Sequence, residues 1–189
     1  PNIQNPTATI SATTTFYLTV TSGTSACTGI DSVTIYVNSF PLISTIADTT
    51  ICSLSPLVLN TNSNAATYQW TPAAYVSNPG IASPNFIGPN SQRLYVTGTT
   101  AGCSSIDSVD VIVNPLPVVQ TINDTTLCSP QNITLTTTGA QTYSWSPATG
   151  LSNPNIASPV FSGTTQQTYT VTGTDAIGCK NTDAVTVFF

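Results

Sequence analysis

The stretch that decides the fold is YSWSPATGLSNPNIASPVF at residues 143–161, because a closely similar stretch, YQWTPAAYVSNPGIASPNF, occupies residues 68–86. Each copy starts with an alternating segment that ends at a tryptophan and continues into a loop rich in Pro, Asn and Ser. Alternation with a period of two indicates a β-strand with one buried face, and Pro and Asn clusters indicate turns. The chain is therefore built from an internal repeat, and repeats decide the architecture of a chain before any single motif does.

The similarity extends outward from this stretch in both directions. The segment PLISTIADTTIC at 41–52 matches PLPVVQTINDTTLC at 115–128, and a glycine-containing segment that ends in cysteine occurs three times. The spacing between copies is 76 residues at Cys27, Cys103 and Cys179 and again at Cys52 and Cys128, 75 at Trp70 and Trp145, and 74 at Tyr95 and Tyr169. We expect a half repeat at 1–40 and complete repeats at 41–114 and 115–189. The short, Pro-containing junctions at 38–41 and 114–117 predict semi-rigid connections between neighbours.

Each repeat is predicted to be all-β. The expected strands are 57–61, 67–70, 93–97 and 109–113 in the second repeat, and 133–137, 142–145, 168–172 and 184–188 in the third. Six or seven short strands in about 75 residues indicate a small immunoglobulin-like β-sandwich. Such sandwiches bury a tryptophan between their sheets, and the aromatics that recur in the repeats are therefore expected in the core: Trp70, Trp145, Tyr17, Tyr95 and Tyr169.

The composition argues against an enzyme. The chain has no His, no Glu and no Met, its only cations are Arg93 and Lys180, and all seven acidic residues are Asp. General acid–base catalysis near neutral pH relies on His or on a carboxylate or Lys with a tuned pKa, and an activated Ser or Cys needs a neighbouring base. No C-x-x-C pair suggests zinc, and two cations cannot neutralise a nucleic-acid backbone. We expect no catalytic residues, no cofactor and no nucleic-acid partner.

The surface is expected to be polar but almost uncharged. Only 5% of the residues are charged, so Thr, Ser, Asn and Gln must keep the chain in solution. β-Branched Thr suits the exposed face of a strand. The sequence contains no run of about 18 apolar residues, so we expect no direct membrane insertion of this fragment. The chain begins at Pro1 in the middle of a repeat pattern, and we therefore expect an internal fragment.

The five cysteines are expected to form disulfides, which places the chain in an oxidising, extracellular compartment. Pairing within a repeat would join Cys52 to Cys103 and Cys128 to Cys179, each 51 residues apart, and leave Cys27 for a partner upstream of Pro1. A domain of about 75 residues is marginally stable alone, and closing a loop of about 50 residues adds roughly 4 kcal/mol on the chain-entropy model. The alternative pairs Cys27 with Cys52 and Cys103 with Cys128, and would lock adjacent repeats together. The sequence favours the pairing within repeats.

The blocks YSWSPATGLSNPNIASPVF, TYTVTGTDAIGC, VIVNPLP and DTTLC resemble the PKD-like or immunoglobulin-like repeats of very large Bacteroidota surface proteins. That group includes gliding-motility adhesins exported by the type IX secretion system. The resemblance covers the whole chain, is closest over 115–189, and concerns the repeat type more than the role of any one protein. It implies a secreted, surface-located chain in which this segment is a stalk.

Asp recurs at two places in the repeat, and three roles are considered for it. Local capping of turns and strand starts is the first. The second follows from the resemblance, because Bacteroidota O-glycosylation follows a D-[ST]-apolar or D-[ST]-small signal. The third is a calcium site at Asp107 and Asp110, although the chain lacks the D-x-D-x-D-G loop common in calcium sites. The candidate glycan acceptors are Ser32, Thr49, Ser108 and Thr125.

Three functions follow from these patterns. The first is a structural stalk whose partners are adjacent repeats of the same chain. The second is a subunit of an extracellular filament, in which identical chains complete the exposed strand edges of the half repeat. The third is a carbohydrate-binding accessory module, for which the sequence offers no evident exposed aromatic platform.

Overall fold

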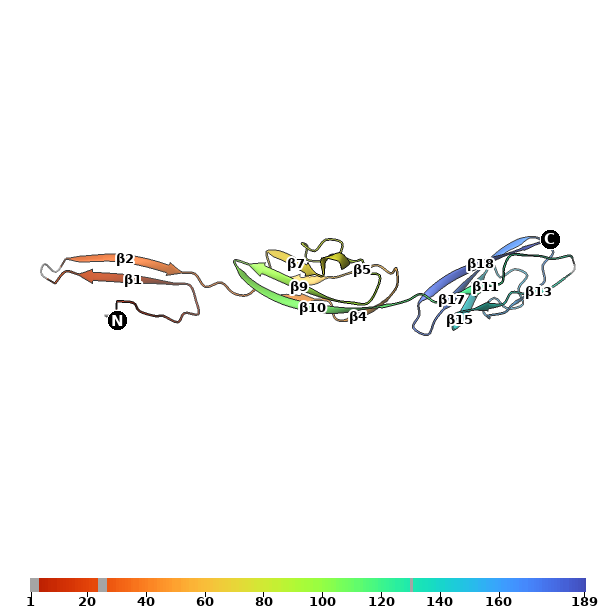
Figure 1. The fold of residues 1–189 in the computed structure, drawn as a ribbon, viewed down its shortest axis with the longest axis horizontal. Helices are drawn as coiled ribbons and strands as arrows, with labels where there is room; N and C mark the ends of the chain where they lie inside the picture. Colours follow the sequence, from red (N-terminus) through yellow and green to blue (C-terminus); the bar gives the residue numbers. More distant parts are fainter. Residues whose placement is uncertain (1–3, 24–26, 130) are drawn as a thin grey trace. The chain divides into compact units, whose positions relative to one another are not determined.

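The computed structural model describes residues 4–23, 27–129 and 131–189, and its regular secondary structure is almost entirely β-strand (Figure 1). It separates into two compact units. Unit 1 contains Pro1–Asp48, Pro56–Gly88 and Arg93–Asp110, and unit 2 contains Thr49–Ser55, Pro89–Gln92 and Val111–Phe189. The repeat boundaries after residues 40 and 114 stay a prediction.

The first 40 residues contribute one antiparallel hairpin. Strands β1 (Thr14–Thr21) and β2 (Thr28–Ile35) pair along their full length, with Phe16 opposite Val33. In the described part of the chain, no third strand joins this two-stranded sheet. Its apolar side chains consequently remain largely exposed.

The second repeat forms one four-stranded sheet and two small two-stranded sheets. The larger sheet has the order β4 (Thr49–Cys52), β10 (Cys103–Asn114), β9 (Gln92–Thr100) and β7 (Thr67–Thr71). The smaller sheets pair β3 (Ile43–Thr45) with β6 (Thr61–Ser63), and β5 (Leu57–Val58) with β8 (Asn85–Phe86). A single 3₁₀ turn, η1 (Ala73–Tyr75), follows β7.

The third repeat reproduces this topology inside unit 2. Strands β12 (Thr125–Thr126), β18 (Lys180–Phe188), β17 (Gln167–Thr174) and β15 (Thr142–Ser146) form the larger sheet in that order. The smaller sheets pair β11 (Gln120–Thr121) with β14 (Thr137–Thr138), and β13 (Ile133–Thr134) with β16 (Val160–Phe161). The predicted class, all-β with tandem immunoglobulin-like sandwiches, is confirmed.

Strict alternation along the strands builds the core. In β17 the side chains of Tyr169 and Val171 are buried, whereas the neighbouring threonines face solvent. The core of the third repeat contains Val119, Leu135, Trp145, Phe161, Tyr169, Val171, Val185 and Val187. Burial of apolar area at about 25 cal/mol per Å² is the main term that stabilises such a sandwich.

The loop that follows each tryptophan explains why SNP-x-IASP is the best-matched part of the repeat. The Trp145 backbone N–H donates to Pro154 O at 2.8 Å, and its indole Nε1–H donates to Ile156 O at 3.0 Å. Trp70 makes the same two bonds, to Pro79 O at 2.8 Å and Ile81 O at 3.1 Å. The loop therefore satisfies the polar edge of a buried indole, which a buried Trp needs. The predicted burial of Trp70, Trp145 and Tyr169 is confirmed.

The predicted burial of Tyr95 and Tyr17 is wrong. Tyr95 lies opposite Thr71 and is 44% exposed, whereas its neighbour Leu94 is fully buried. The structural equivalent of Tyr169 is therefore Leu94, at a spacing of 75 rather than 74 residues. Because side chains alternate across a strand, a one-residue slip moves a side chain to the opposite face.

Tyr17 fails for the same reason. Phe16 lies opposite Val33 as Tyr169 lies opposite Val185, so Phe16 occupies the inward position and Tyr17 the outward one. Tyr17 is 73% exposed.

In the described residues, no helix has the length and hydrophobicity that crossing a bilayer would require.

Candidate functional site: the cystine at the end of strand β4

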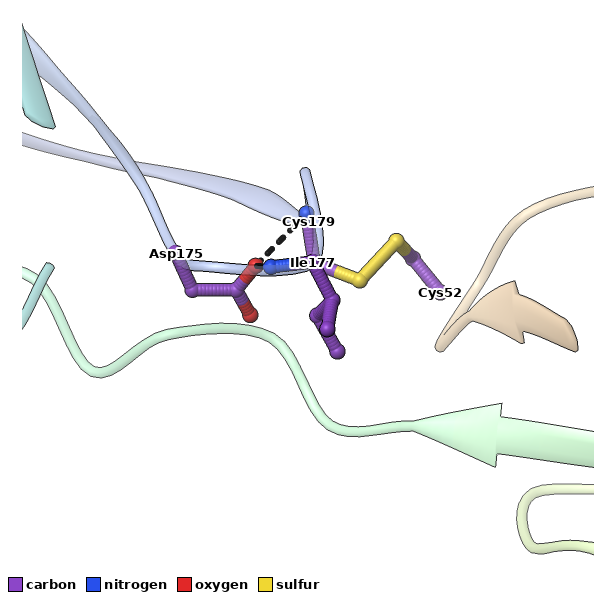
Figure 2. The surroundings of a disulfide bond; sticks show 4 residues. All are labelled: Cys52, Asp175, Ile177 and Cys179. Atoms are coloured by element: carbon purple, nitrogen blue, oxygen red, sulfur yellow. Dashed lines mark hydrogen bonds between the residues drawn. A yellow bond between two sulfur atoms is a disulfide. The ribbon is translucent and has the colours of Figure 1, made fainter. Parts of the chain in front are cut away.

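A disulfide between Cys52 and Cys179 is the main chemical feature of the described chain (Figure 2). The two Cα atoms are 5.6 Å apart, within the range that a disulfide spans, and the residues are separated by 127 positions in the sequence. Both cysteines belong to unit 2. Cys52 comes from the second repeat and Cys179 from the third, so the bond links two successive repeats covalently.

Cys179 sits in a loop between β17 and β18 that an aspartate organises. The Asp175 carboxylate oxygen Oδ1 accepts the backbone N–H of Ile177 at 3.0 Å and that of Cys179 at 2.9 Å (Figure 2). Gly178 completes the turn with a positive φ of 90°, which glycine adopts without strain. The Cys179 side chain is only 1% exposed. The loop therefore holds its backbone in place while the sulfur reaches Cys52.

Cys52 is positioned by parallel strand pairing. Strand β4 runs beside the end of β10, where Cys52 lies opposite Asn114. The next backbone N–H, that of Ser53, donates to Asn114 O at 2.7 Å. The strand pairing thus fixes the cysteine at the far end of β10, next to the junction that leads into the third repeat.

The structure corrects the predicted cysteine pairing. Cys52 lies beside the last residue of β10, whereas Cys103 is its first residue, so about eleven steps of roughly 3.3 Å separate the two positions. That distance exceeds the reach of a disulfide several-fold. In the third repeat, Cys128 follows β12, which pairs with the end of β18, and Cys179 precedes the start of β18. Each predicted intra-repeat pair therefore lies at opposite ends of a long strand.

The alternative pairing is not formed either. Cys27, Cys103 and Cys128 are free thiols, so neither Cys27–Cys52 nor Cys103–Cys128 exists. The expectation that Cys27 has an upstream partner stays a prediction. Cys27 and Cys128 are exposed, whereas Cys103 is half-buried, and its thiol donates to Asn38 O at 3.7 Å.

The recurring aspartates brace the sheets rather than gather into a site. Asp48 Oδ1 accepts the Asp110 N–H at 2.8 Å, and Asp124 Oδ1 accepts the Thr186 N–H at 2.7 Å. A second matched pair of bonds links Asp107 to the Thr45 N–H and Asp183 to the Thr121 N–H, both at 2.8 Å. All four bonds span 62 residues, so these carboxylates tie strands from the two halves of a repeat. Local capping, the expected role, is also present: Asp31 and Asp183 each accept the N–H of the following residue.

The carboxylates considered for calcium have other partners. Asp110 accepts two hydrogen bonds from the Arg93 guanidinium, the one from Nε at 2.7 Å, and Asp107 accepts the Thr45 N–H. The hydrogen bonds from Arg93 lower the pKa of the exposed Asp110 carboxyl, and the partnership raises that of Arg93. Exposed pairs of this kind contribute little to stability. Within the described ranges, no three potential metal-ligating side chains cluster.

The four candidate glycan acceptors lie on strands. Ser32 is exposed on β2, whereas Thr49, Ser108 and Thr125 are partly buried on β4, β10 and β12. Exposure favours Ser32 as an acceptor among these four, and modification at all of them stays a prediction.

Sequence reasoning missed both the inter-repeat cystine and the aspartate braces. The cystine had no local signal, because the parallel pairing of β4 with β10, which puts Cys52 at the wrong end for a bond within the repeat, is visible only in the structure. The braces did have a signal, since Asp recurs at matched positions in both halves of the repeat.

Comparison with protein-family models and with curated proteins finds no match. Among solved structures, the chain is similar to the titin I-band fragment I67–I69, with 9% identity, a TM-score of 0.45, and coverage of 93% of this chain and 74% of that one. It is also similar to extracellular domains 3–5 of Drosophila OTK, with 8% identity, a TM-score of 0.41, and coverage of 87% and 67%. DIP-gamma IG1+IG2 matches with 11% identity, a TM-score of 0.38, and coverage of 79% and 97%. These likenesses concern the fold alone.

Proposed function

We propose that this chain is a run of structural spacer repeats from a secreted cell-surface protein, which extends an adhesive end away from the cell. The observation that carries the proposal is the Cys52–Cys179 cystine, because it joins a cysteine of the second sequence repeat to one of the third, and not two cysteines of the same repeat. Disulfides form and persist in oxidising compartments, and the cystine therefore supports an extracellular location. Gliding-motility adhesins of the type IX secretion system are the class that the repeat sequence resembles.

The position of the cystine suits a protein that carries tension. When the two ends of the chain are pulled apart, the shortest covalent path leaves the backbone at Cys52 and rejoins it at Cys179. The backbone from 53 to 178 then bears no load as long as the bond holds. A spacer with this connectivity transmits force through a covalent bypass while its sandwiches stay folded.

No catalytic step is part of the proposal. The sequence has seven Asp and two cationic residues. Arg93 and Asp110 form an exposed ion pair, and four other carboxylates accept hydrogen bonds from backbone N–H groups. Trp70 and Trp145, the two tryptophans of the sequence, are buried in the cores, so neither indole can stack on a sugar. These facts favour a spacer over the carbohydrate-binding alternative.

A tether assay tests the spacer role. The chain is inserted in one, two or three copies between a surface anchor and a binding tip of known affinity. We expect the reach of the tip to grow with copy number while its affinity stays constant. Binding of the repeats themselves to glycans or cells, in the absence of the tip, would contradict the proposal.

A filament subunit is the second candidate, and the exposed face of the β1–β2 hairpin favours it. Val33 is 57% exposed, although its equivalents Val109 and Val185 are at most 1% exposed in the complete repeats. An apolar sheet face of this kind can be covered by strands of another chain. Sedimentation velocity of the purified chain over a range of concentrations distinguishes the spacer from the filament subunit, because a spacer stays monomeric and a filament subunit polymerises.

A further inference from the structure

The cysteines of the repeat fall into two types that occupy opposite ends of the sandwich strands. We name Cys52 and Cys128, which follow the sequence D-T-T-I/L, strand cysteines. We name Cys27, Cys103 and Cys179 loop cysteines, because they follow a TVT or VTG segment and lie at or just before the start of the returning strand; Cys103 is the first residue of β10. The single bond that is formed joins a strand cysteine of one repeat to the loop cysteine of the next. Cys103 is a loop cysteine with a free thiol.

Cys103 lies near a chain segment that corresponds, one repeat earlier, to the segment beside Cys52. Its Sγ lies 3.7 Å from Asn38 O, and the Asn38 side-chain amide donates to Ala101 O at 3.0 Å, within unit 1. Asn38 is the repeat equivalent of Asn114, 76 residues later, and Asn114 is the residue opposite Cys52. The Cys103 thiol thus lies next to Asn38, and the residue that corresponds to Asn38 in the next repeat, Asn114, has the strand cysteine Cys52 opposite it.

The chain segment next to Cys103, residues 35–38, makes the same kind of hydrogen bond as residues 111–114 do in the second repeat. The Val37 N–H donates to Thr13 Oγ1 at 3.1 Å, as the equivalent Val113 N–H donates to Ser91 Oγ at 2.9 Å. In the second repeat, residues 111–114 pair with β4 on their other edge. The β1–β2 sheet has only two strands in the described residues, so the corresponding edge of β2 carries no β4-type strand.

We propose that Cys103 is the receiving half of a second inter-repeat cystine. Its partner is the cysteine of a D-T-T-x-C strand that lies parallel to the chain at residues 35–38, as β4 lies along 111–114. The thiolate of Cys103 attacks the Sγ of this cysteine while that Sγ is held in a disulfide with a second thiol; the old S–S bond breaks, and the second thiol leaves as a thiolate that takes up the proton. When both cysteines start as thiols, an external disulfide accepts the two electrons and is reduced to two thiols. Because the two thiols belong to the repeat itself, the proposal holds whether the array is a stalk or a filament.

Disulfide exchange with a strand peptide tests this. The probe is a peptide with the sequence of residues 45–53, TIADTTICS, whose cysteine carries a 2-thiopyridyl disulfide, and the control is a scrambled peptide with its cysteine at the same place. The full chain, with Cys52 and Cys179 oxidised, is mixed with each peptide, and the labelled cysteine is identified by mass spectrometry. We expect the native peptide to label Cys103 about tenfold faster than the scrambled peptide does, since strand pairing raises the effective concentration.

The chain contains its own controls. Cys27 and Cys128 are exposed thiols and should react equally fast with both peptides, because neither lies beside an open β4-type edge. A peptide in which the equivalent of Asp48 is Ala should lose part of the advantage at Cys103, since that carboxylate binds a backbone N–H of the neighbouring strand in the second repeat. Equal labelling of Cys103 by native and scrambled peptides would overturn the proposal.

Discussion

Breaking the inter-repeat cystine should release a defined length of chain under tension. The perturbation is Cys52→Ser, and the molecule is pulled from its two ends. The disulfide encloses a separation of 127 residues, which at about 3.5 Å per extended residue hides roughly 44 nm of contour length. With the bond intact, only 1–52 and 179–189 lie on the load path, with a contour length of about 22 nm.

Single-molecule force spectroscopy measures this length directly. We expect full extension of the oxidised chain to stop near 22 nm and that of the Cys52→Ser chain to reach about 66 nm. Cys103→Ser is the matched control, because Cys103 is a free thiol and its loss should leave the extension of the oxidised chain unchanged. If Cys52 were bonded to Cys103 instead, the Cys103→Ser substitution would break that bond and lengthen the chain by about 18 nm. That lengthening, or equal extensions for the oxidised chain and Cys52→Ser, would refute the reasoning.

Three further substitutions and one control test the packing and the turns of the third repeat. Trp145→Ala removes a buried indole with a satisfied Nε1–H and should cost unit 2 about 3–5 kcal/mol in chemical denaturation; a loss below about 1 kcal/mol would contradict the buried position. Burial raises the pKa of Tyr169 above its ordinary value of 10.0, so the phenol stays neutral to a higher pH in the folded chain than in the unfolded one. The unfolded chain ionises first, and the stability present below about pH 10 is therefore lost as the pH rises towards the folded pKa. Tyr169→Phe should abolish this alkaline loss, and an unchanged pH profile of thermal unfolding would speak against it. Gly139→Ala should destabilise unit 2 by more than about 2 kcal/mol, because Gly139 has a φ of 95° and a Cβ there would lie 1.7 Å from Val118 O. Gly178→Ala is its control: φ is 90° but the space is open, so about 1 kcal/mol is expected, and equal effects in thermal unfolding would argue against the close contact.

The fold and the tryptophan cores could be predicted from the sequence because they depend on local signals. Alternation marks the strands, and the repeated W-x-P and SNP-x-IASP segments mark a buried indole with its loop. Tyr95 was misplaced because equating residues by type hid a length difference in the hairpin, where Thr100–Gly102 corresponds to the longer loop of 175–178. Counting from Gly98 and Gly173 places Leu94 and Tyr169 at the same inward position.

The cysteine pairing depended on information that is not local. Separation along the chain favoured Cys52 with Cys103, yet a twelve-residue strand, β10, holds these two positions at its opposite ends. The parallel pairing of β4 with β10 has a short, four-residue register that alternation alone does not reveal. Once that register is known, a bond inside the repeat is sterically excluded, and the loop cysteine of the next repeat becomes the available partner.

The most direct test of the inter-repeat cystine is a disulfide map of the chain purified under oxidising conditions with its free thiols blocked. Proteolysis without reduction, followed by mass spectrometry, should yield one cross-linked species that joins the peptide containing Cys52 to the peptide containing Cys179, with Cys27, Cys103 and Cys128 carrying the blocking group. Recovery of Cys52 linked to Cys103 together with Cys128 linked to Cys179 would contradict it.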